Sequence, residues 1–311
     1  MAEAGSFPVR IAAVDIGSNA IRFLAVEFSE PRHYHVLAQR RLALRLGHDV
    51  FAKGVIGPQS CAALLDALAQ FTHTMDDLHA QHRRVVATSA VRDSRNGAEF
   101  VGRARNEVAT EIDVVSGEEE ARLVYTAIRH RVPLRREKWL LVDLGGGSLE
   151  ISLIDASRIY ASETHRLGAV RLLEETTNGG TEDVRRHVQQ RTEVLRQSAL
   201  LGASHGKLIA TGGNIEALAA LAHVRRKRQG AARLPIGELT SLGERLAGLS
   251  CADRIRQLGL RPDRADVILP AALVYERVAA LAHADSITVP YVGLKEGIVL
   301  DLLERRMPAA S

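Results

Sequence analysis

The chain has 311 residues, 46% of them hydrophobic and 25% charged, which is typical of a globular protein large enough for two domains. Its net charge of +4 suits a polyanionic ligand without selecting one, and its two cysteines are too few for a disulfide framework or a zinc site. No segment approaches the roughly 20 apolar residues of a membrane span, and the N-terminus lacks a signal-peptide pattern, so we expect a cytoplasmic protein without membrane contacts.

The first predicted element is a hairpin over residues 11–26. An apolar strand leads to a turn that contains Asp15, Gly17, Ser18 and Asn19, and a second apolar strand follows. The turn residues are polar or small, so they could approach a ligand closely.

Residues 34–45 are expected to form a third strand and residues 59–81 an amphipathic helix. A strand over 84–87 then leads into the polar segment 88–93. Ligands collect at the carboxyl ends of strands in open α/β sheets, so Arg92 is a candidate phosphate ligand whose planar guanidinium matches two oxygens. A solvated loop arginine is the alternative interpretation.

A helix is predicted to begin near residue 117, because Ser116 and Glu119 have the spacing of a capping box. Glu119 then belongs to the cap, and Glu118 lies on a polar face. Glu120 lies on the inward, apolar stripe, where a carboxylate is a candidate general base. The alternative interpretation is that the glutamates form a charged first turn that complements the helix dipole. This explains Glu118 and Glu119 better than it explains Glu120.

The polar, basic segment 129–138 is predicted to connect two domains. We place the first domain at residues 1–130 and the second at 131–294. A last helix at about 295–311 is expected to pack back on the first domain.

Residues 139–154 repeat the plan of residues 11–26, with a buried strand, Asp143, a glycine turn and another strand. Consecutive glycines allow unusual backbone angles, and successive amides in such a turn can form an anion-binding nest. Asp143 could hold a Mg²⁺ that bridges phosphate oxygens. An ordinary glycine-rich hairpin with a turn-forming aspartate fits the same segment.

In the rest of the second domain, the sequence predicts a helix over 181–200 that is capped by Thr181 and preceded by a break at 178–180. A strand over 208–210 ends in a third glycine turn at 211–214, and the helix that follows could attract an anion at its N-terminus.

Basic residues gather in two runs, at 129–136 and at 225–228, which could line a track for a long polyanion or be solvated faces. Helices are expected over 236–282, with Pro262 and Pro270 as stops. No nucleic-acid-binding module is recognisable, because the aromatic residues are scattered.

Taken together, the segments IAAVDIGSNAIR, ATSAVRDS, SGEEEARL, VDLGGGSLE, LGAVRL, ATGGN and VGLKEGI resemble the exopolyphosphatase/guanosine pentaphosphate phosphohydrolase (Ppx/GppA) family. The resemblance covers residues 11–303. It implies an α/β protein with two actin-like, ribonuclease H-like domains that flank a cleft. It also implies Mg²⁺-dependent hydrolysis of a terminal phosphoanhydride, with Mn²⁺ as the alternative ion. The chain resembles the short, two-domain members.

The resemblance also implies roles for individual residues. Glu120 matches the catalytic glutamate, and Asp143 and Glu150 match metal-associated carboxylates. Asp15 of the first hairpin is expected to be a further metal ligand. The expected phosphate-binding residues are Ser18, Asn19, Arg22, Arg92, Gly145, Gly146, Gly147, Ser148, Thr211, Gly212, Gly213 and Asn214. Leu149 replaces a common threonine, and the turn at 211–214 departs from the usual family sequence, which bears on substrate choice.

The sequence therefore predicts an exopolyphosphatase that acts on inorganic polyphosphate. The first alternative is removal of the 5′ γ-phosphate of guanosine pentaphosphate, with (p)ppGpp as ligand. More distant alternatives are an ATP-dependent kinase and a non-catalytic sensor of alarmone or nucleotide, for which Glu120 has no obvious use. A homodimer is one assembly that the chain could form, and no nucleic acid is expected as a partner.

Overall fold

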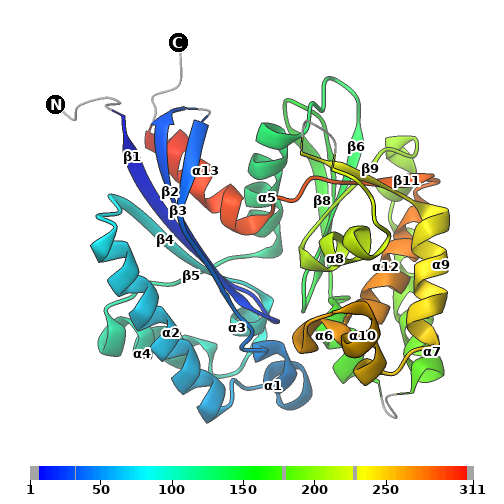
Figure 1. Ribbon diagram of the computed structural model, residues 1–311, viewed down its shortest axis with the longest axis horizontal. Helices are drawn as coiled ribbons and strands as arrows, with labels where there is room; N and C mark the ends of the chain where they lie inside the picture. The colour runs from blue at the N-terminus through cyan, green and yellow to red at the C-terminus, as the bar shows by residue number, and fades with distance from the viewer. Residues whose placement is uncertain (1–6, 32, 177–179, 227–229, 307–311) are drawn as a thin grey trace. The chain divides into compact units, whose positions relative to one another are not determined.

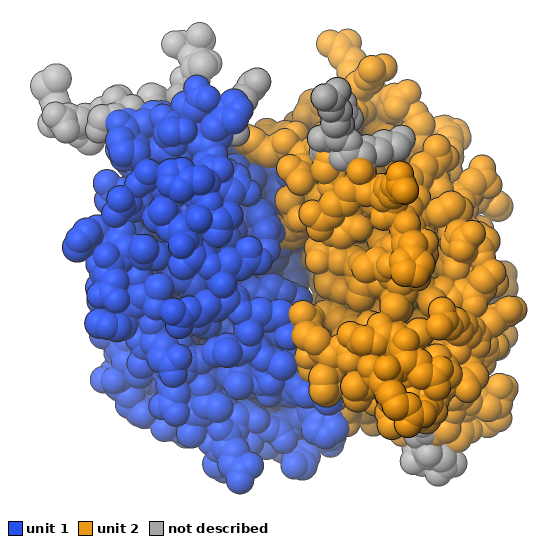
Figure 2. Space-filling model, in the orientation of Figure 1, with its two compact units in different colours: residues 1–127, 294–311 blue, residues 128–293 orange. Residues whose placement is uncertain are grey.

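The computed structural model describes residues 7–31, 33–176, 180–226 and 230–306. The chain forms two compact units (Figure 2): the first comprises residues 1–127 and 294–311, and the second comprises residues 128–293. The chain therefore passes from the first unit to the second within one helix, α5, and returns directly before the last helix, α13.

The first unit is built on a five-stranded mixed sheet with the order β3-β2-β1-β4-β5 (Figure 1). Its strands are β1 (Val9–Ile16), β2 (Ile21–Glu30), β3 (His33–Leu42), β4 (His82–Ala87) and β5 (Asp113–Val114). The first three strands pair antiparallel, whereas β4 pairs parallel with both β1 and β5. The central strand β1 is buried along almost its whole length, which explains its nearly continuous apolar sequence.

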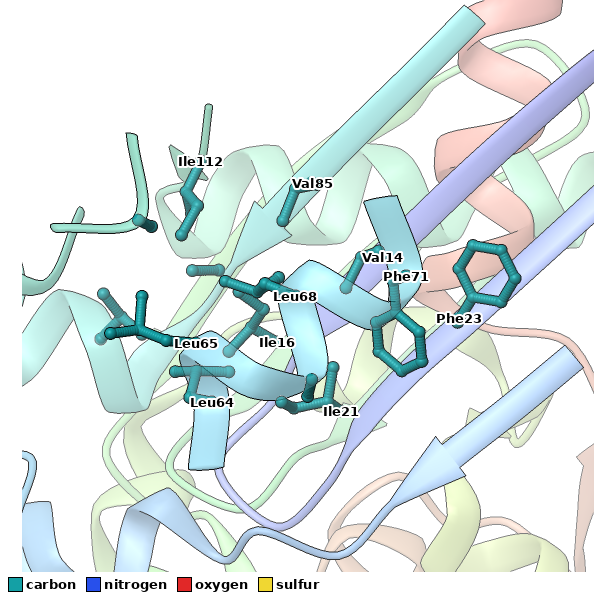
Figure 3. Packing of buried hydrophobic residues seen from close by; sticks show 14 of the residues in the cluster. Val14, Ile16, Ile21, Phe23, Leu64, Leu65, Leu68, Phe71, Val85 and Ile112 are labelled. Carbon is teal, nitrogen blue, oxygen red and sulfur yellow. The ribbon is translucent and has the colours of Figure 1, made fainter. Parts of the chain in front are cut away.

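Helices cover both faces of this sheet. They are α1 (Leu46–Lys53), α2 (Pro58–Asp77), α3 (Ser89–Asp93), α4 (Gly97–Val108), α5 (Gly117–Arg131) and α13 (Leu294–Arg306). Figure 3 shows the apolar side chains of α2 packed on β1 and β2, where the rings of Phe23 and Phe71 stack with centroids 5.0 Å apart. The last helix, α13, packs against β1, β2 and β4.

The second unit contains a six-stranded mixed sheet with the order β10-β11-β9-β6-β7-β8 (Figure 1). Its strands are β6 (Trp139–Leu144), β7 (Leu149–Ile154), β8 (Ile159–His165), β9 (Leu208–Thr211), β10 (Ala232–Pro235) and β11 (Ser286–Val289). Its α-helices are α6 (Ala169–Glu174), α7 (Thr181–Thr192), α8 (Gly213–Leu221), α9 (Ile236–Ala247), α10 (Cys251–Leu258), α11 (Pro262–Ala265) and α12 (Ile268–Leu281). The apolar helix α12 packs against α6, α7, α8 and α9.

The two sheets share one topology. The order β3-β2-β1-β4 in the first unit corresponds to β8-β7-β6-β9 in the second, with the same pattern of antiparallel and parallel pairs. This is the ribonuclease H-like order of actin-like domains, so the predicted α/β fold class is confirmed. The repeated hairpins at 11–26 and 139–154 are its two equivalent first elements.

Several local predictions were wrong. No helix was predicted between residues 45 and 59, but α1 lies there, and Gly54, with φ 77°, ends it. Helix α7 begins after the extended residue Gly180, so Thr181 is its first helical residue and not its cap. The same helix ends at Thr192, whose hydroxyl donates to the Val188 carbonyl at 2.7 Å, and 3₁₀ turns follow at Glu193–Gln197 and Leu201–Ser204.

Pro270 does not stop a helix. It lies in the first turn of α12, where no backbone N–H is needed for an intrahelical bond. The short edge strand β10 was not predicted, because four residues give too little pattern. Among the described strands, β10 pairs with β11 alone, and it ends at Pro235.

Some predictions fall on residues that are not described here. The helix break at residues 178 and 179, the basic residues 227 and 228, and positions 307–311 of the predicted last helix lie outside the described residues. Among the helices of the described residues, none combines the length and the apolar composition that crossing a membrane requires.

Candidate active site

The two hairpin turns are closed by the same backbone hydrogen bond. In the first unit, the Gly17 amide donates to the Ala20 carbonyl at 3.2 Å. In the second unit, the Gly145 amide donates to the Ser148 carbonyl at 3.0 Å. Each turn thus has four residues between its strands, which places an aspartate at the same position before each turn, Asp15 and Asp143.

The glycine turn of the second unit rests on the start of α6. The Ala169 amide donates to the Gly145 carbonyl at 3.1 Å, and the Val170 amide donates to the Gly146 carbonyl at 2.9 Å. In a trans peptide the carbonyl and the following N–H point in opposite directions. The amides of residues 146 and 147 are therefore directed away from α6, as an anion-binding nest requires.

Two further residues hold this turn, and the sequence did not reveal their role. The Arg171 side chain is 4% exposed and donates from Nε to the Gly147 carbonyl at 2.8 Å, which directs the Ser148 amide away from it. A Cβ on Gly168 would lie 2.3 Å from backbone atoms of Gly146 and Gly147, so only glycine fits there. The segment LGAVRL contains both residues, but nothing in its pattern indicates the contact.

The first unit repeats the arrangement with α1. The Gly47 amide donates to the Ser18 carbonyl at 2.7 Å, and the Arg45 amide donates to the Asn19 carbonyl at 3.2 Å. The amides of residues 19 and 20 are therefore turned away from α1. The Ser18 and Ser89 hydroxyls lie 2.9 Å apart, which ties the turn to the start of α3, directly after β4.

The charges behind the two turns differ. Asp15 faces Arg22 across the β1–β2 pair and accepts a hydrogen bond from it at 2.8 Å. At the corresponding position of β6–β7, Asp143 faces Glu150, and their carboxylate oxygens lie within 4.8 Å of one another. Two like charges directly opposite each other are unfavourable unless a cation shares them.

This acid pair fits a divalent metal ion. Carboxylate oxygens are the ligands that Mg²⁺ prefers, and one or two of them suffice because the ion keeps several waters. Glu150 is 2% exposed, so it is shielded from bulk solvent that could screen the repulsion. Asp15 forms an ion pair with Arg22, and its metal role stays a prediction.

The third turn lies beside this acid pair. Thr211 pairs with Asp143 in the parallel β6–β9 register, and Gly212 has a φ of 96° that favours glycine. A Cβ on Gly212 would come within 3.3 Å of the Asp143 Oδ1 atom. Among the described residues, the buried hydroxyls of Thr211 and Ser148 have no hydrogen-bond partner, so both could serve a bound anion or a metal-bound water.

Arg264 is another residue that the sequence analysis missed. It is 5% exposed and donates from Nη1 to Asn214 Oδ1, and a Cβ on Gly213 would lie 2.6 Å from its Nη2. The hydroxyl of Tyr275 donates to the Thr211 carbonyl at 3.1 Å, and burial raises the pKa of that tyrosine well above its usual value. The third turn is therefore fixed by side chains from α11 and α12.

The predicted general base lies in the first turn of α5. The Ser116 hydroxyl accepts the Glu119 amide at 3.2 Å, which confirms the cap, although the Glu119 carboxylate pairs with Arg122 instead of completing the box. Glu120 is 6% exposed, and its Oε2 lies 3.7 Å from Arg92 Nη1. Arg92 also donates to the Val115 carbonyl at 2.8 Å.

Within each unit, the structure thus brings the predicted residues into groups. The first unit joins Glu120 to Arg92, and it places Ser18 and Asn19 on the first turn and Arg22 in β2 directly after that turn. The second unit gathers the acid pair, the 145–148 turn and the 211–214 turn. The roles of these residues in binding and catalysis remain predictions.

Known proteins resemble the chain over most of its length. Residues 26–306 match the Ppx/GppA phosphatase family. Exopolyphosphatase 2 of Mycobacterium tuberculosis is 29% identical over 94% of this chain and 98% of its own. A crystal structure of an exopolyphosphatase from Cytophaga hutchinsonii is 25% identical, with a TM-score of 0.87 and coverage of 97% and 100%. A family member from Aquifex aeolicus has the same fold at 22% identity, with a TM-score of 0.80 and coverage of 97% and 99%.

Proposed function

Because the chain belongs to the Ppx/GppA phosphatase family, we propose that it is an exopolyphosphatase that releases the terminal phosphate of inorganic polyphosphate. The observation that carries the proposal is the Asp143–Glu150 pair beside a glycine turn whose amides are directed away from α6. Such a group can hold a cation and a phosphate side by side. Relatives that align over most of the chain include two mycobacterial proteins named exopolyphosphatases, which supports the same substrate class.

In the proposed reaction, a water oxygen attacks the terminal phosphorus and the bridging P–O bond breaks. The products are inorganic phosphate and a polyphosphate chain one unit shorter. Glu120 accepts the proton of the attacking water as general base. Its burial and its ion pair with Arg92 hold the carboxylate in one orientation.

The remaining work is charge stabilisation. Phosphoryl transfer depends mainly on positioning and on neutralising the phosphate oxygens. We assign this role to the amides of the 17–20 and 145–148 turns and to Arg22 and Arg92. Asp143 and Glu150 would hold Mg²⁺, or Mn²⁺ in its place, and the ion would supply further positive charge to those oxygens. The proposal requires that Glu120 of the first unit and the acid pair of the second unit act on the same phosphate.

A second candidate is the hydrolysis of guanosine pentaphosphate, the alternative that the resemblance to the Ppx/GppA family implies. The 211–214 turn, which departs from the usual family sequence, bears on this choice. The chemistry at the terminal phosphate would be the same, and only the group that follows it would differ.

Phosphate release from polyphosphates of several lengths and from guanosine pentaphosphate, with Mg²⁺ and with EDTA, tests the proposal. We expect Mg²⁺-dependent release that is faster on polyphosphate. Faster release from guanosine pentaphosphate would favour the second candidate. ADP formation that depends on an added acceptor would indicate a kinase, and tight binding without release would indicate a sensor. Cytoplasmic location and a homodimer are tested separately by cell fractionation and light scattering.

A further inference from the structure

The last helix carries a buried acid that three arginines share. Asp301 of α13 is 4% exposed. Its carboxylate lies 2.9 Å from Arg122 Nη1, 3.2 Å from Arg84 Nη1 and 2.8 Å from Arg305 Nε. Arg122 belongs to α5 and Arg84 to β4, so a single carboxylate of α13 links these two elements.

The same helix touches the backbone of α5 directly. A Cβ on Gly297 would lie 2.0 Å from the Leu123 carbonyl oxygen. Contacts between heavy atoms are normally about 3.5 Å or longer, so a Cβ at this position must move away from that oxygen by roughly 1.5 Å, which pushes the two helices apart. Glycine at this position therefore sets the spacing between α13 and α5.

These contacts converge on residues 119–123 of α5. Arg122 also holds Glu119, with Nε 2.6 Å from Oε2, and Arg84 Nη2 lies 3.5 Å from the same carboxylate. One face of the 119–123 turn is therefore fixed to α13 and β4. Glu120 projects from the adjoining face toward Arg92.

We propose that Gly297 and Asp301 are positioning residues for Glu120, so that α13 determines the position of the general base. The inference rests on the proposed function, because it assumes that Glu120 takes a proton in the reaction. A displacement of about 1 Å in a catalytic group can lower the rate by about 100-fold. Substrate binding through other residues would change little, so the effect should fall on kcat and not on KM.

The test compares two variants with matched controls in the same unit. Gly297→Ala adds the Cβ that meets the Leu123 carbonyl, whereas a Cβ at Gly102 of α4 meets nothing within 4 Å, so Gly102→Ala is its control. Asp301→Asn removes the shared charge. Asp113→Asn is its control, because Asp113 pairs with Arg84 at 2.8 Å but lies on exposed β5.

We expect Gly297→Ala and Asp301→Asn to lower kcat by about tenfold or more, with KM within about twofold of the wild type. Both controls should keep wild-type kcat. Amide hydrogen exchange of residues 118–123 should become faster in the two variants and stay unchanged in the controls. Hydrogen exchange does not depend on activity. It therefore tests the contact between α13 and α5 even if the wild type releases no phosphate and the proposed function is wrong.

Three results would overturn the inference. The first is wild-type kcat in both folded variants. The second is unchanged exchange of residues 118–123 in both variants. The third is a loss of kcat that disappears when the assay is run at 10 °C, since that would show only thermal destabilisation. If Asp301→Asn does not fold, Gly297→Ala decides alone.

Discussion

Glu150 holds, in the hairpin of the second unit, the position that Arg22 holds in the hairpin of the first. Arg22 lies opposite Asp15 and neutralises it at 2.8 Å, whereas Glu150 lies opposite Asp143 and repeats its charge. The first hairpin thus contains its own cation. The second hairpin carries a second acid at that position, and we propose that this Asp143–Glu150 pair binds a metal ion.

The metal proposal can be tested by thermal unfolding. In the wild type, a divalent ion at about 100 times its Kd should stabilise the fold by about 2.7 kcal/mol. Glu150→Gln should abolish most of that response, and in EDTA it should unfold at the wild-type temperature or above it, because the like-charge repulsion is gone. A Mg²⁺ or Mn²⁺ titration followed by calorimetry measures both effects.

Glu163→Gln is the matched control for this prediction. Glu163 lies on the neighbouring strand β8, one residue before the register partner of Glu150. Its replacement should leave the metal response intact. An unaltered response in Glu150→Gln would remove that residue from the metal site.

The general-base role predicts the effect of Glu120→Gln. A general base contributes typically about 10²–10⁴-fold, so turnover should fall by that range while KM changes little. Glu118→Gln, which changes a glutamate in the same turn that is not buried, should keep near-normal turnover. Initial rates of phosphate release give both values, and near-normal turnover in Glu120→Gln would be incompatible with the role.

The backbone of the third turn predicts a stability effect at Gly212. Its φ is 96°, and a Cβ there would lie 3.3 Å from Asp143 Oδ1, so alanine is both strained and crowded. Gly212→Ala should lower the free energy of unfolding by about 1–3 kcal/mol. Urea denaturation provides the measurement.

The control for Gly212 is Gly237→Ala in α9. A Cβ at Gly237 meets nothing within 4 Å, and the residue is helical. Alanine there should be neutral or stabilising by about 0.5–1 kcal/mol. Equal effects of the two substitutions would contradict the strain argument.

Glu276 of α12 predicts a pH dependence of stability. Burial raises the pKa of its carboxyl to about 7, with Glu244 adding to the rise and Arg185 opposing it. Between about pH 4.5 and 7 the unfolded chain has lost this proton and the folded chain has kept it. The unfolded state then binds fewer protons, so the free energy of unfolding falls as pH rises through this window.

The expected loss at Glu276 is on the order of 1–3 kcal/mol between pH 4.5 and 7.5. Glu276→Gln should remove this part of the pH dependence, and the exposed Glu238→Gln should not. Urea denaturation at a series of pH values tests the prediction. An identical pH profile for wild type and Glu276→Gln would show that another group is responsible.

The local pattern of the sequence was enough to predict the hairpins and the helix that carry the candidate site residues. The alternation of apolar strands and small-residue turns predicted both hairpins, because residues a few positions apart determine a hairpin. The cap at Ser116 and the inward stripe of α5 placed Glu120 for the same reason. The acids Asp15 and Asp143 could be placed at strand ends from the sequence alone.

Tertiary structure alone decided what supports those elements. Arg171 reaches the carbonyl of a residue 24 positions away, and Arg264 reaches a side chain 50 positions away. Gly297 meets Leu123 from the far end of the chain. Such contacts form only when segments far apart in the sequence pack together. The type of a residue does not indicate which distant residue it will contact. The sequence therefore determined which groups could do the chemistry, and the packing decided which buried residues hold them in place.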